Sequence, residues 1–199
     1  MIMRVLSLFA SPVSKNRAML NIFRKKPSSE WLIADKLYMQ SVSQARLPYF
    51  YEKGGVADTP DGRFDMIMLH VYLILRRFRR APEKTQLIGQ ALFDRMFVDI
   101  DQNLREMGAG DIGVAYRVKD MAKAFYGRIA AYDEGLDGEN DACLANALRR
   151  NLFRKTLPHD RDVRAMAEYV REQVLSLDKQ GTLEILESQN VFSSDGVSK

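Results

Sequence analysis

The segment GRFDMIMLHVYLILRRFRR, residues 62–80, decides the fold because it is the most apolar part of the chain. One stripe at helical spacing consists of Phe64, Met68, Val71, Leu75 and Phe78, and a second consists of Met66, His70, Leu73 and Arg77. A helix that is apolar over most of its circumference packs inside a protein. We therefore predict a buried central helix, whose final arginines suit the negative end of the helix dipole.

The segments on either side of this helix also repeat their apolar residues with the period of an α-helix. They predict helices over residues 28–46, 83–107, 114–136, 140–153, 162–177 and 182–189. Ser28 or Ser29 is a suitable N-cap for the first of them. Because no segment alternates as a strand does, we predict an all-α fold, a compact single-domain bundle of six to seven helices. The predicted domain covers residues 28–190, between a basic N-terminal arm, residues 1–27, and a disordered tail, residues 191–199.

Residues 47–63, LPYFYEKGGVADTPDGR, predict a loop between the first two helices. Prolines and glycines interrupt any helical period there. Three consecutive aromatic residues, 49–51, are expected to cover one edge of the core.

The composition allows one compact core, since 46% of the 199 residues are hydrophobic. A chain of this size buries roughly 70% of the surface that its unfolded form exposes. No apolar run approaches the roughly 18–20 residues of a membrane span, so we predict no integral membrane segment. The single cysteine, Cys143, excludes a disulfide within the chain and a cysteine-rich zinc site, which fits a reducing compartment.

The positive charge of the chain is concentrated in its first 27 residues. These hold six bases and no acid, so the remaining residues carry 24 bases against 26 acids, a net charge of −2, while the whole chain carries +4. Three interpretations of this arm stay open: an organelle-targeting sequence, a solvated disordered tail, and a peripheral membrane anchor. In the anchor, Leu20, Ile22 and Phe23 enter the bilayer surface while Arg24, Lys25 and Lys26 meet anionic lipid. A start at Met19 would leave residues 1–18 untranslated.

The stretch DIDQNLREMGAGDIG, residues 99–113, begins like a calcium-binding EF-hand loop. The template fails where it is decisive, because its turn glycine is replaced by Leu104 and its bidentate glutamate by Gly110. The glycine-rich part lacks the Lys and the Ser or Thr of a phosphate-binding P-loop and follows no strand. The sequence therefore predicts neither a calcium nor a phosphate site here.

A helix end accounts for the same stretch. Two ion pairs at i,i+4 spacing are available, Arg95 with Asp99 and Asp101 with Arg105. Gly108 or Gly110 is expected to supply the left-handed turn that closes the helix. Asp111 is expected to cap the helix that follows.

Catalytic signatures are weak throughout the sequence. Asp94, Asp99 and Asp101 resemble the metal-binding acids of an all-α prenyl-chain enzyme, but no second acidic helix of that kind is present. His70 is expected to be a hydrogen-bonded core residue inside the central helix. No positioned base marks Cys143 or a serine as a nucleophile. We predict a protein that is not an enzyme and has no cofactor or metal.

Two long blocks, residues 37–80 and 90–133, closely resemble the ubiquinol–cytochrome c chaperone family. The motifs that carry the resemblance are DGRFD with LH, LFD, D-x-D-x-NLREMG-x-GD, and FYGR followed by AYD. The similarity spans Trp31 to Asp133, about half the chain. Because the mitochondrial members are longer, this chain resembles a bacterial relative.

The resemblance implies an all-α chaperone that binds newly made cytochrome b for haem acquisition and assembly of the ubiquinol–cytochrome c reductase. It also implies a small partner protein and contact with the ribosome, and no DNA. The expected location is the cytoplasm or the inner-membrane surface, or the mitochondrial matrix in a eukaryote. The alternatives are a module that binds RNA or an anionic membrane surface, and an all-α metal-dependent enzyme.

Candidate contact residues follow from the motif blocks. For the client or partner they are Asp94, Asp99, Asp101, Arg105, Glu106, Asp111, Lys119 and Arg128. For a membrane or RNA they are Arg24, Lys25, Lys26, Arg76, Arg77, Arg79 and Arg80. An apolar groove for the client is expected to use adaptable methionines, with Met66, Met68, Met96, Met107 and Met121 as candidates.

Overall fold

The computed structural model describes residues 27–108, 110–138 and 141–194, and within these ranges the regular secondary structure is entirely α-helical. Six helices have at least 11 residues and two are shorter. They are α3 (Ser29–Ala45), α4 (Tyr49–Glu52), α5 (Pro60–Phe78), α6 (Pro82–Glu106), α7 (Asp111–Asp137), α8 (Asp141–Asn151), α9 (Asp160–Lys179) and α10 (Thr182–Glu187). The predicted all-α domain is confirmed. The arm candidates Arg24, Lys25 and Lys26 lie outside the described residues.

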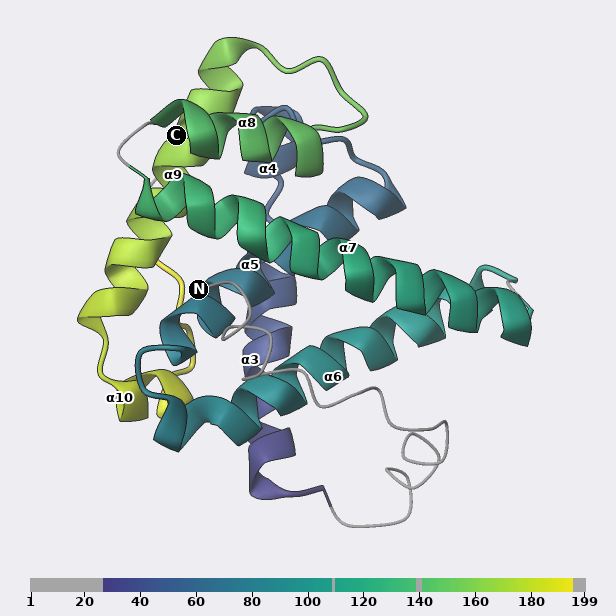
Figure 1. Ribbon diagram of the computed structural model, residues 1–199, viewed down its shortest axis with the longest axis vertical. Helices are drawn as coiled ribbons and strands as arrows, with labels where there is room; N and C mark the ends of the chain where they lie inside the picture. The colour runs from purple at the N-terminus through teal and green to yellow at the C-terminus, as the bar shows by residue number, and fades with distance from the viewer. Residues whose placement is uncertain (1–26, 109, 139–140, 195–199) are drawn as a thin grey trace.

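Helix α5 is the centre of the molecule, as its apolar circumference predicts (Figure 1). Of its 19 residues, 14 are buried, including every position from 65 to 75. Its N-cap is Thr59, whose hydroxyl accepts a hydrogen bond from the backbone N–H of Gly62 at 3.1 Å. Helices α3, α6 and α9 pack against it, and α8 packs between α7 and α9.

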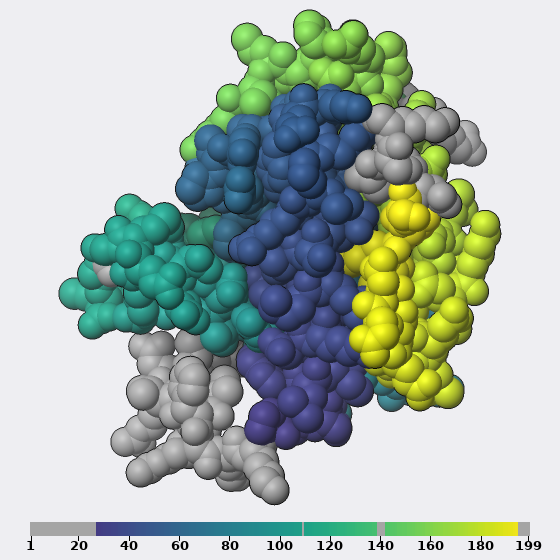
Figure 2. Space-filling view, turned by 180° about the vertical axis from the view of Figure 1, so that it is seen from behind, coloured from purple at the N-terminus to yellow at the C-terminus, as the bar shows by residue number. Residues whose placement is uncertain are grey.

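Helices α6 and α7 form a long hairpin whose closed end projects from the body, at the right of Figure 1 and the left of Figure 2. The turn uses Gly108 at φ +85°, a left-handed conformation in which glycine has no steric cost. The predicted cap by Asp111 is wrong. Gly110 occupies the N-cap position, and the Asp111 carboxylate pairs with Arg105 instead.

The expected loop over residues 47–63 contains the short helix α4, which places Phe50 in the core at 0% exposure. The aromatic cover at the edge of the core is therefore confirmed, although a helical turn and not an irregular loop positions it.

Ser28 is the N-cap of α3, because its hydroxyl accepts a hydrogen bond from the Trp31 N–H at 3.3 Å.

A disordered tail from residue 191 is contradicted for residues 191–194. Val191 and Phe192 are 1% and 4% exposed, and the Phe192 ring meets His70 edge-on at 5.0 Å between centroids. Gln40 Oε1 accepts a hydrogen bond from the Val191 N–H at 3.0 Å. Figure 2 shows this C-terminal segment lying alongside α3. It therefore completes the core on the side opposite to the hairpin end.

His70 is a hydrogen-bonded core residue, as predicted, with 0% of its surface exposed. Its Nδ1 lies 2.8 Å from the Met66 carbonyl oxygen, which can only accept, so Nδ1 carries the proton. Its Nε2 then accepts from the Tyr169 hydroxyl at 2.7 Å, and that oxygen accepts from Gln44 Nε2 at 3.1 Å. Burial lowers the pKa of His70 to about 4, so the imidazole is neutral at physiological pH.

Candidate protein-binding site

The projecting end of the α6–α7 hairpin presents large apolar side chains to solvent. Met107 is 62% exposed, Ile112 is 86% exposed and Tyr116 is 69% exposed. Ile112 and Tyr116 lie one turn apart on the same face of α7, and Met107 lies in the turn that joins the helices. Among the described residues near this end, only Leu104 and Val114 are buried. We call Met107, Ile112 and Tyr116 the hairpin apex, since grouped exposed apolar residues mark interaction surfaces.

Four of the predicted charged candidates lie at the same end of the hairpin as the apex, and each of them already has a partner in the protein. Arg105 lies between Asp101, whose carboxylate oxygen is 2.6 Å from the Arg105 Nε, and Asp111. Glu106 accepts a hydrogen bond from Gln102 at 3.0 Å. These four charged candidates are thus brought together at the hairpin end, where they form an exposed polar rim.

Asp99 faces the body of the molecule rather than solvent. Its carboxylate accepts a hydrogen bond from the Tyr38 hydroxyl of α3 at 2.8 Å, and Arg95 lies 3.6 Å away. Burial, followed by the charge of Asp99, raises the pKa of the Tyr38 hydroxyl well above its ordinary range. Asp99 therefore joins α3 to α6. The predicted i,i+4 pairs of Arg95 with Asp99 and of Asp101 with Arg105 are both confirmed.

The remaining two exposed candidates lie farther along the helices. Asp94 is exposed on α6 and accepts a hydrogen bond from Gln90 at 2.9 Å. Lys119 is exposed on α7, one turn beyond Tyr116. Lys119 is close enough to the apex along the helix to contribute a positive charge to the same surface, whereas Asp94 is not at the hairpin end.

Arg128, another predicted contact residue, has a side chain that is only 10% exposed and binds inside the protein. Its guanidinium lies 2.8 Å from the Asp65 carboxylate, and Asp65 also meets Arg154 at 2.8 Å. The buried Asp65 thus joins α5, α7 and the segment after α8. Burial raises the pKa of Asp65 above its ordinary value in spite of both arginines.

The arginine cluster at the end of α5 does not form a free basic surface. Arg76 and Arg79 bind Asp133 of α7 at 2.8 Å and 2.6 Å, and Arg76 also binds Asp137. Burial alone would raise the pKa of Asp133, but hydrogen bonds from Arg79, Tyr72 and Arg76 hold it below its ordinary value.

The other two arginines of this cluster also have partners in the protein. Arg77 is buried and donates to the backbone carbonyls of Leu177 and Gln180. Arg80 is 57% exposed and pairs with Asp178. The charges of Arg76, Arg77 and Arg79 are therefore used in helix packing, and contact of this cluster with a membrane or RNA stays a prediction.

The expected methionine groove is not formed by the residues named for it. Met66, Met68 and Met96 are at most 3% exposed and fill the core. Met121 is partly buried against the core, and Met107 alone belongs to the exposed apex.

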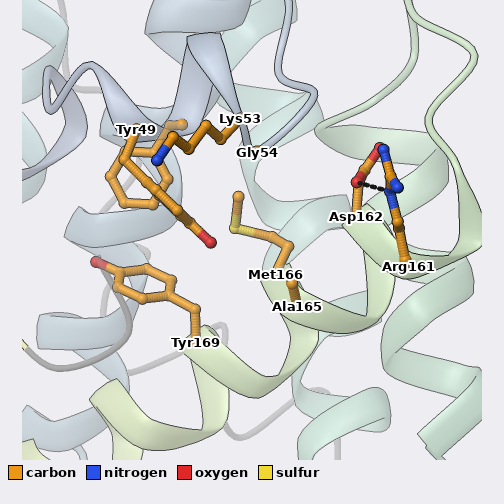
Figure 3. Close-up of a pocket in the computed structure, with 9 residues that line it drawn as sticks. Tyr49, Lys53, Gly54, Arg161, Asp162, Ala165, Met166 and Tyr169 are labelled. Atoms are coloured by element: carbon orange, nitrogen blue, oxygen red, sulfur yellow. Dashed lines mark hydrogen bonds and ion pairs between the residues drawn. The ribbon is translucent and has the colours of Figure 1, made fainter. Parts of the chain in front are cut away.

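A cavity of about 220 Å³ lies between α4 and α9. Its lining residues are Tyr49, Phe50, Lys53, Gly54, Arg161, Asp162, Ala165, Met166 and Tyr169. Figure 3 shows Tyr49, Met166 and Tyr169 facing one another across it, with Arg161 and Asp162 to one side. The sequence did not predict this cavity, because its two walls are more than 100 residues apart.

The described residues contain no group of three or more His, Cys, Asp or Glu side chains placed to hold a metal ion. Among the same residues, no helix is long and apolar enough to cross a membrane.

Comparison with known proteins identifies relatives of one kind. The "Ubiquinol-cytochrome-c reductase complex assembly factor 1" of Xenopus laevis is 31% identical over 153 residues, which cover 75% of this chain and 76% of that protein. "Protein CBP3, mitochondrial" of Saccharomyces cerevisiae is 32% identical over 155 residues, 75% of this chain and 45% of the yeast protein. The human assembly factor is 28% identical, and the chain spans 54% of its length.

A solved structure and a family model agree with these relatives. The crystal structure of the Cbp3 homolog from Brucella abortus matches with a TM-score of 0.74 and 32% identity, over 88% of this chain and 96% of that one. The model of the family described as "Ubiquinol-cytochrome C chaperone" matches residues 52–192. The match continues well past Asp133, where the sequence resemblance was expected to end. This chain belongs to the ubiquinol–cytochrome c chaperone family.

Proposed function

We propose that this protein is an assembly chaperone that binds newly made cytochrome b during biogenesis of the ubiquinol–cytochrome c reductase. Its family and the printed names of its relatives support a role in assembly of that complex. The proposed role is one of binding and release, and it includes no catalytic step.

The observation that carries the proposal is the hairpin apex. A new membrane protein exposes apolar segments until it is assembled, and such segments associate with apolar surface on a partner. Met107 and Tyr116 have side chains that adapt to different contact shapes, one through a flexible thioether and one through an amphipathic ring. The rim formed by Asp101, Arg105, Glu106 and Asp111 is suited to the charged residues that flank a membrane segment.

A complementation experiment tests the apex. In a strain that lacks the native gene, the double variant Ile112→Ser with Tyr116→Ser should lower the spectroscopic signal of b-type haem and the reductase activity several-fold, at normal transcript levels. Leu87→Ser is the matched control, since Leu87 is 70% exposed and lies in the N-terminal half of α6, away from the hairpin apex. This control should assemble normal amounts of the complex.

A photo-crosslinker makes the client visible. Placed at residue 112, it should produce an adduct with cytochrome b while translation continues, and placed at residue 87 it should not. Equal crosslinking from both positions, or full assembly with the double variant, would contradict binding through the apex.

Contact of the arm with an anionic membrane surface or with RNA stays a prediction. Deletion of residues 1–27 removes six bases, so association that depends on the arm should be lost even at low salt. In the full chain the same association should be present at low salt and weak at high salt. Vesicle flotation with and without anionic lipid measures association with a membrane surface, and RNA crosslinking measures association with RNA. Unchanged association after the deletion would rule out the arm.

A further inference from the structure

The cavity between α4 and α9 has the form of a socket for one large side chain. Its volume of about 220 Å³ is below the roughly 300–1,000 Å³ of sites that enclose whole small-molecule ligands. One wall comes from residues 49–54 and the other from the first three turns of α9, so both walls belong to firmly packed elements. The side chains that contribute most to binding between proteins typically fill well-packed pockets on the partner.

The interior of the cavity is aromatic. Phe50 meets Tyr49 edge-on at 5.8 Å and Tyr169 edge-on at 5.1 Å between ring centroids. The Tyr169 hydroxyl is engaged by His70 and Gln44, and Tyr169, Phe50 and Met166 are at most 3% exposed, so they form the floor of the cavity. Met166 adds a thioether, which packs well against the edge of an aromatic ring. These surfaces favour an aromatic side chain.

The rim of the cavity is positively charged. Lys53 and Arg161 line it and are exposed, and no ion pair joins Lys53 to any residue in the described ranges. Asp162, the one acid in the lining, is 15% exposed, accepts from the His159 N–H at 3.2 Å and lies 3.3 Å from Arg161. Its charge is therefore largely engaged at the start of α9.

The segment that leads from the end of α8 into the second wall is also rich in bases. Residues 149–164 hold six bases and two acids. Even after Asp61 and Asp65 of α5 are counted against Lys155 and Arg154, an excess of positive charge remains. A ligand that brings negative charge beside its aromatic group is favoured here.

We propose that this cavity, the α4–α9 socket, binds an aromatic side chain of a partner protein that has aspartate or glutamate next to it in sequence. The ring enters between Tyr49 and Ala165, above the buried Phe50 and Met166, and the neighbouring carboxylates meet Lys53 and Arg161. This site is separate from the hairpin apex and does not depend on the identity of the client. It gives the protein a second contact surface, for an acidic peptide segment.

Methionine-methyl NMR on the full chain tests the socket directly. The probes are the tripeptide acetyl-Asp-Trp-Asp-amide, its neutral counterpart acetyl-Asn-Trp-Asn-amide, and N-acetyltryptophan. The acidic tripeptide should shift the Met166 methyl resonance, assigned with Met166→Leu, and should bind at least three-fold more tightly than either of the other probes.

Variants separate the two parts of the proposal. Lys53→Gln should weaken binding of the acidic tripeptide at least three-fold and leave the neutral one unchanged, whereas Lys84→Gln, an exposed lysine on α6, should change neither. Ala165→Leu fills the cavity from an exposed helical position and should abolish binding, whereas Ala130→Leu, an exposed position on α7, should not.

Three results would overturn the socket. The first is the absence of a Met166 shift with the acidic tripeptide. The second is equal binding of the acidic and neutral tripeptides, and the third is tighter binding of N-acetyltryptophan, which would indicate a free aromatic acid in place of a peptide. Because these measurements use purified protein, they are unaffected by the outcome of the complementation experiment.

Discussion

Asp65 and His70 are polar residues buried inside the most apolar helix of the chain. Their partners come from distant positions, with Arg128 and Arg154 on Asp65 and Tyr169 on His70. The sequence indicated that His70 belongs to the core, because it lies inside the predicted buried central helix. It could not indicate the partner, since Tyr169 is 99 residues away and only the packing of α9 on α5 brings it close.

We predict that stability falls in mild acid through His70. Because burial lowers its pKa from 6.5 to about 4, the unfolded chain binds a proton more readily than the folded chain between these values. The contribution of His70 to the free energy of unfolding should therefore be fully present above pH 6.5 and should fall by up to about 3 kcal/mol as the pH falls to 4. Urea unfolding at several pH values measures the slope. His70→Gln should flatten it, whereas replacing the exposed His159 by Gln should leave it in place.

We also predict strong coupling between Asp65 and Arg128. Arg128→Met leaves a buried carboxylate with one fewer partner and should lower the free energy of unfolding by about 3–5 kcal/mol. The double variant with Asp65→Leu should be less destabilised than the sum of the two single changes, because it removes both buried charges. Arg150→Met, an exposed arginine on α8, serves as the control and should cost less than about 0.5 kcal/mol. Additive effects would contradict the pairing.

At the scale of the element, helical periodicity predicted the long helices well and their ends less well. The spacing of apolar residues is set by the helix itself, so it can be read without knowledge of the neighbours. The four-residue helix α4 was missed because prolines and glycines surround it, and its position depends on Phe50 entering the core. The exposed apex was also missed in part, since Met107 continues the apolar seam of α6 but extends beyond the last helix that could cover it.

The same substitution, glycine to alanine, should change the stability of the protein in opposite directions at two positions of α7. A Cβ at Gly135 would lie 2.6 Å from the Cα of Leu144, so Gly135→Ala should push α8 away and cost about 1–3 kcal/mol. At Gly127 nothing lies within 4 Å, so Gly127→Ala should stabilise the protein by up to about 1 kcal/mol through helix propensity alone. Thermal unfolding of the two variants measures the difference. Stabilisation by both would mean that α7 and α8 do not pack this closely.

At the scale of the whole molecule, the C-terminal segment was the main error of sequence reasoning. Val191 and Phe192 are two apolar residues within a short polar stretch, too few to show a period. Their burial depends on a surface made jointly by α3, α5 and α9, through contacts with Gln40, His70 and Gln173. The partner of Arg76 and Arg79 could not be predicted for the same reason, because Asp133 is more than 50 residues away.

Termination of the chain tests how much this segment stabilises the fold. A chain that ends after Gln189 loses Phe192 and should be less stable by about 3 kcal/mol or more, as expected for removal of a buried phenylalanine. A chain that ends after Ser194 keeps every contact described for the segment and should match the full chain. Chemical denaturation of the three proteins decides between a structural segment and a dispensable one.

The projecting hairpin has a consequence for amide hydrogen exchange. Of the residues that the structure describes near its end, only Leu104 and Val114 are buried. Opening its last turns therefore exposes little apolar surface and requires much less free energy than unfolding α5. Backbone amides of residues 104–118 should therefore exchange with solvent deuterium through local opening. Those of residues 65–75 should exchange only when the whole domain unfolds. A ligand on the apex would slow the first group selectively, which makes exchange rates a direct readout of where a client sits.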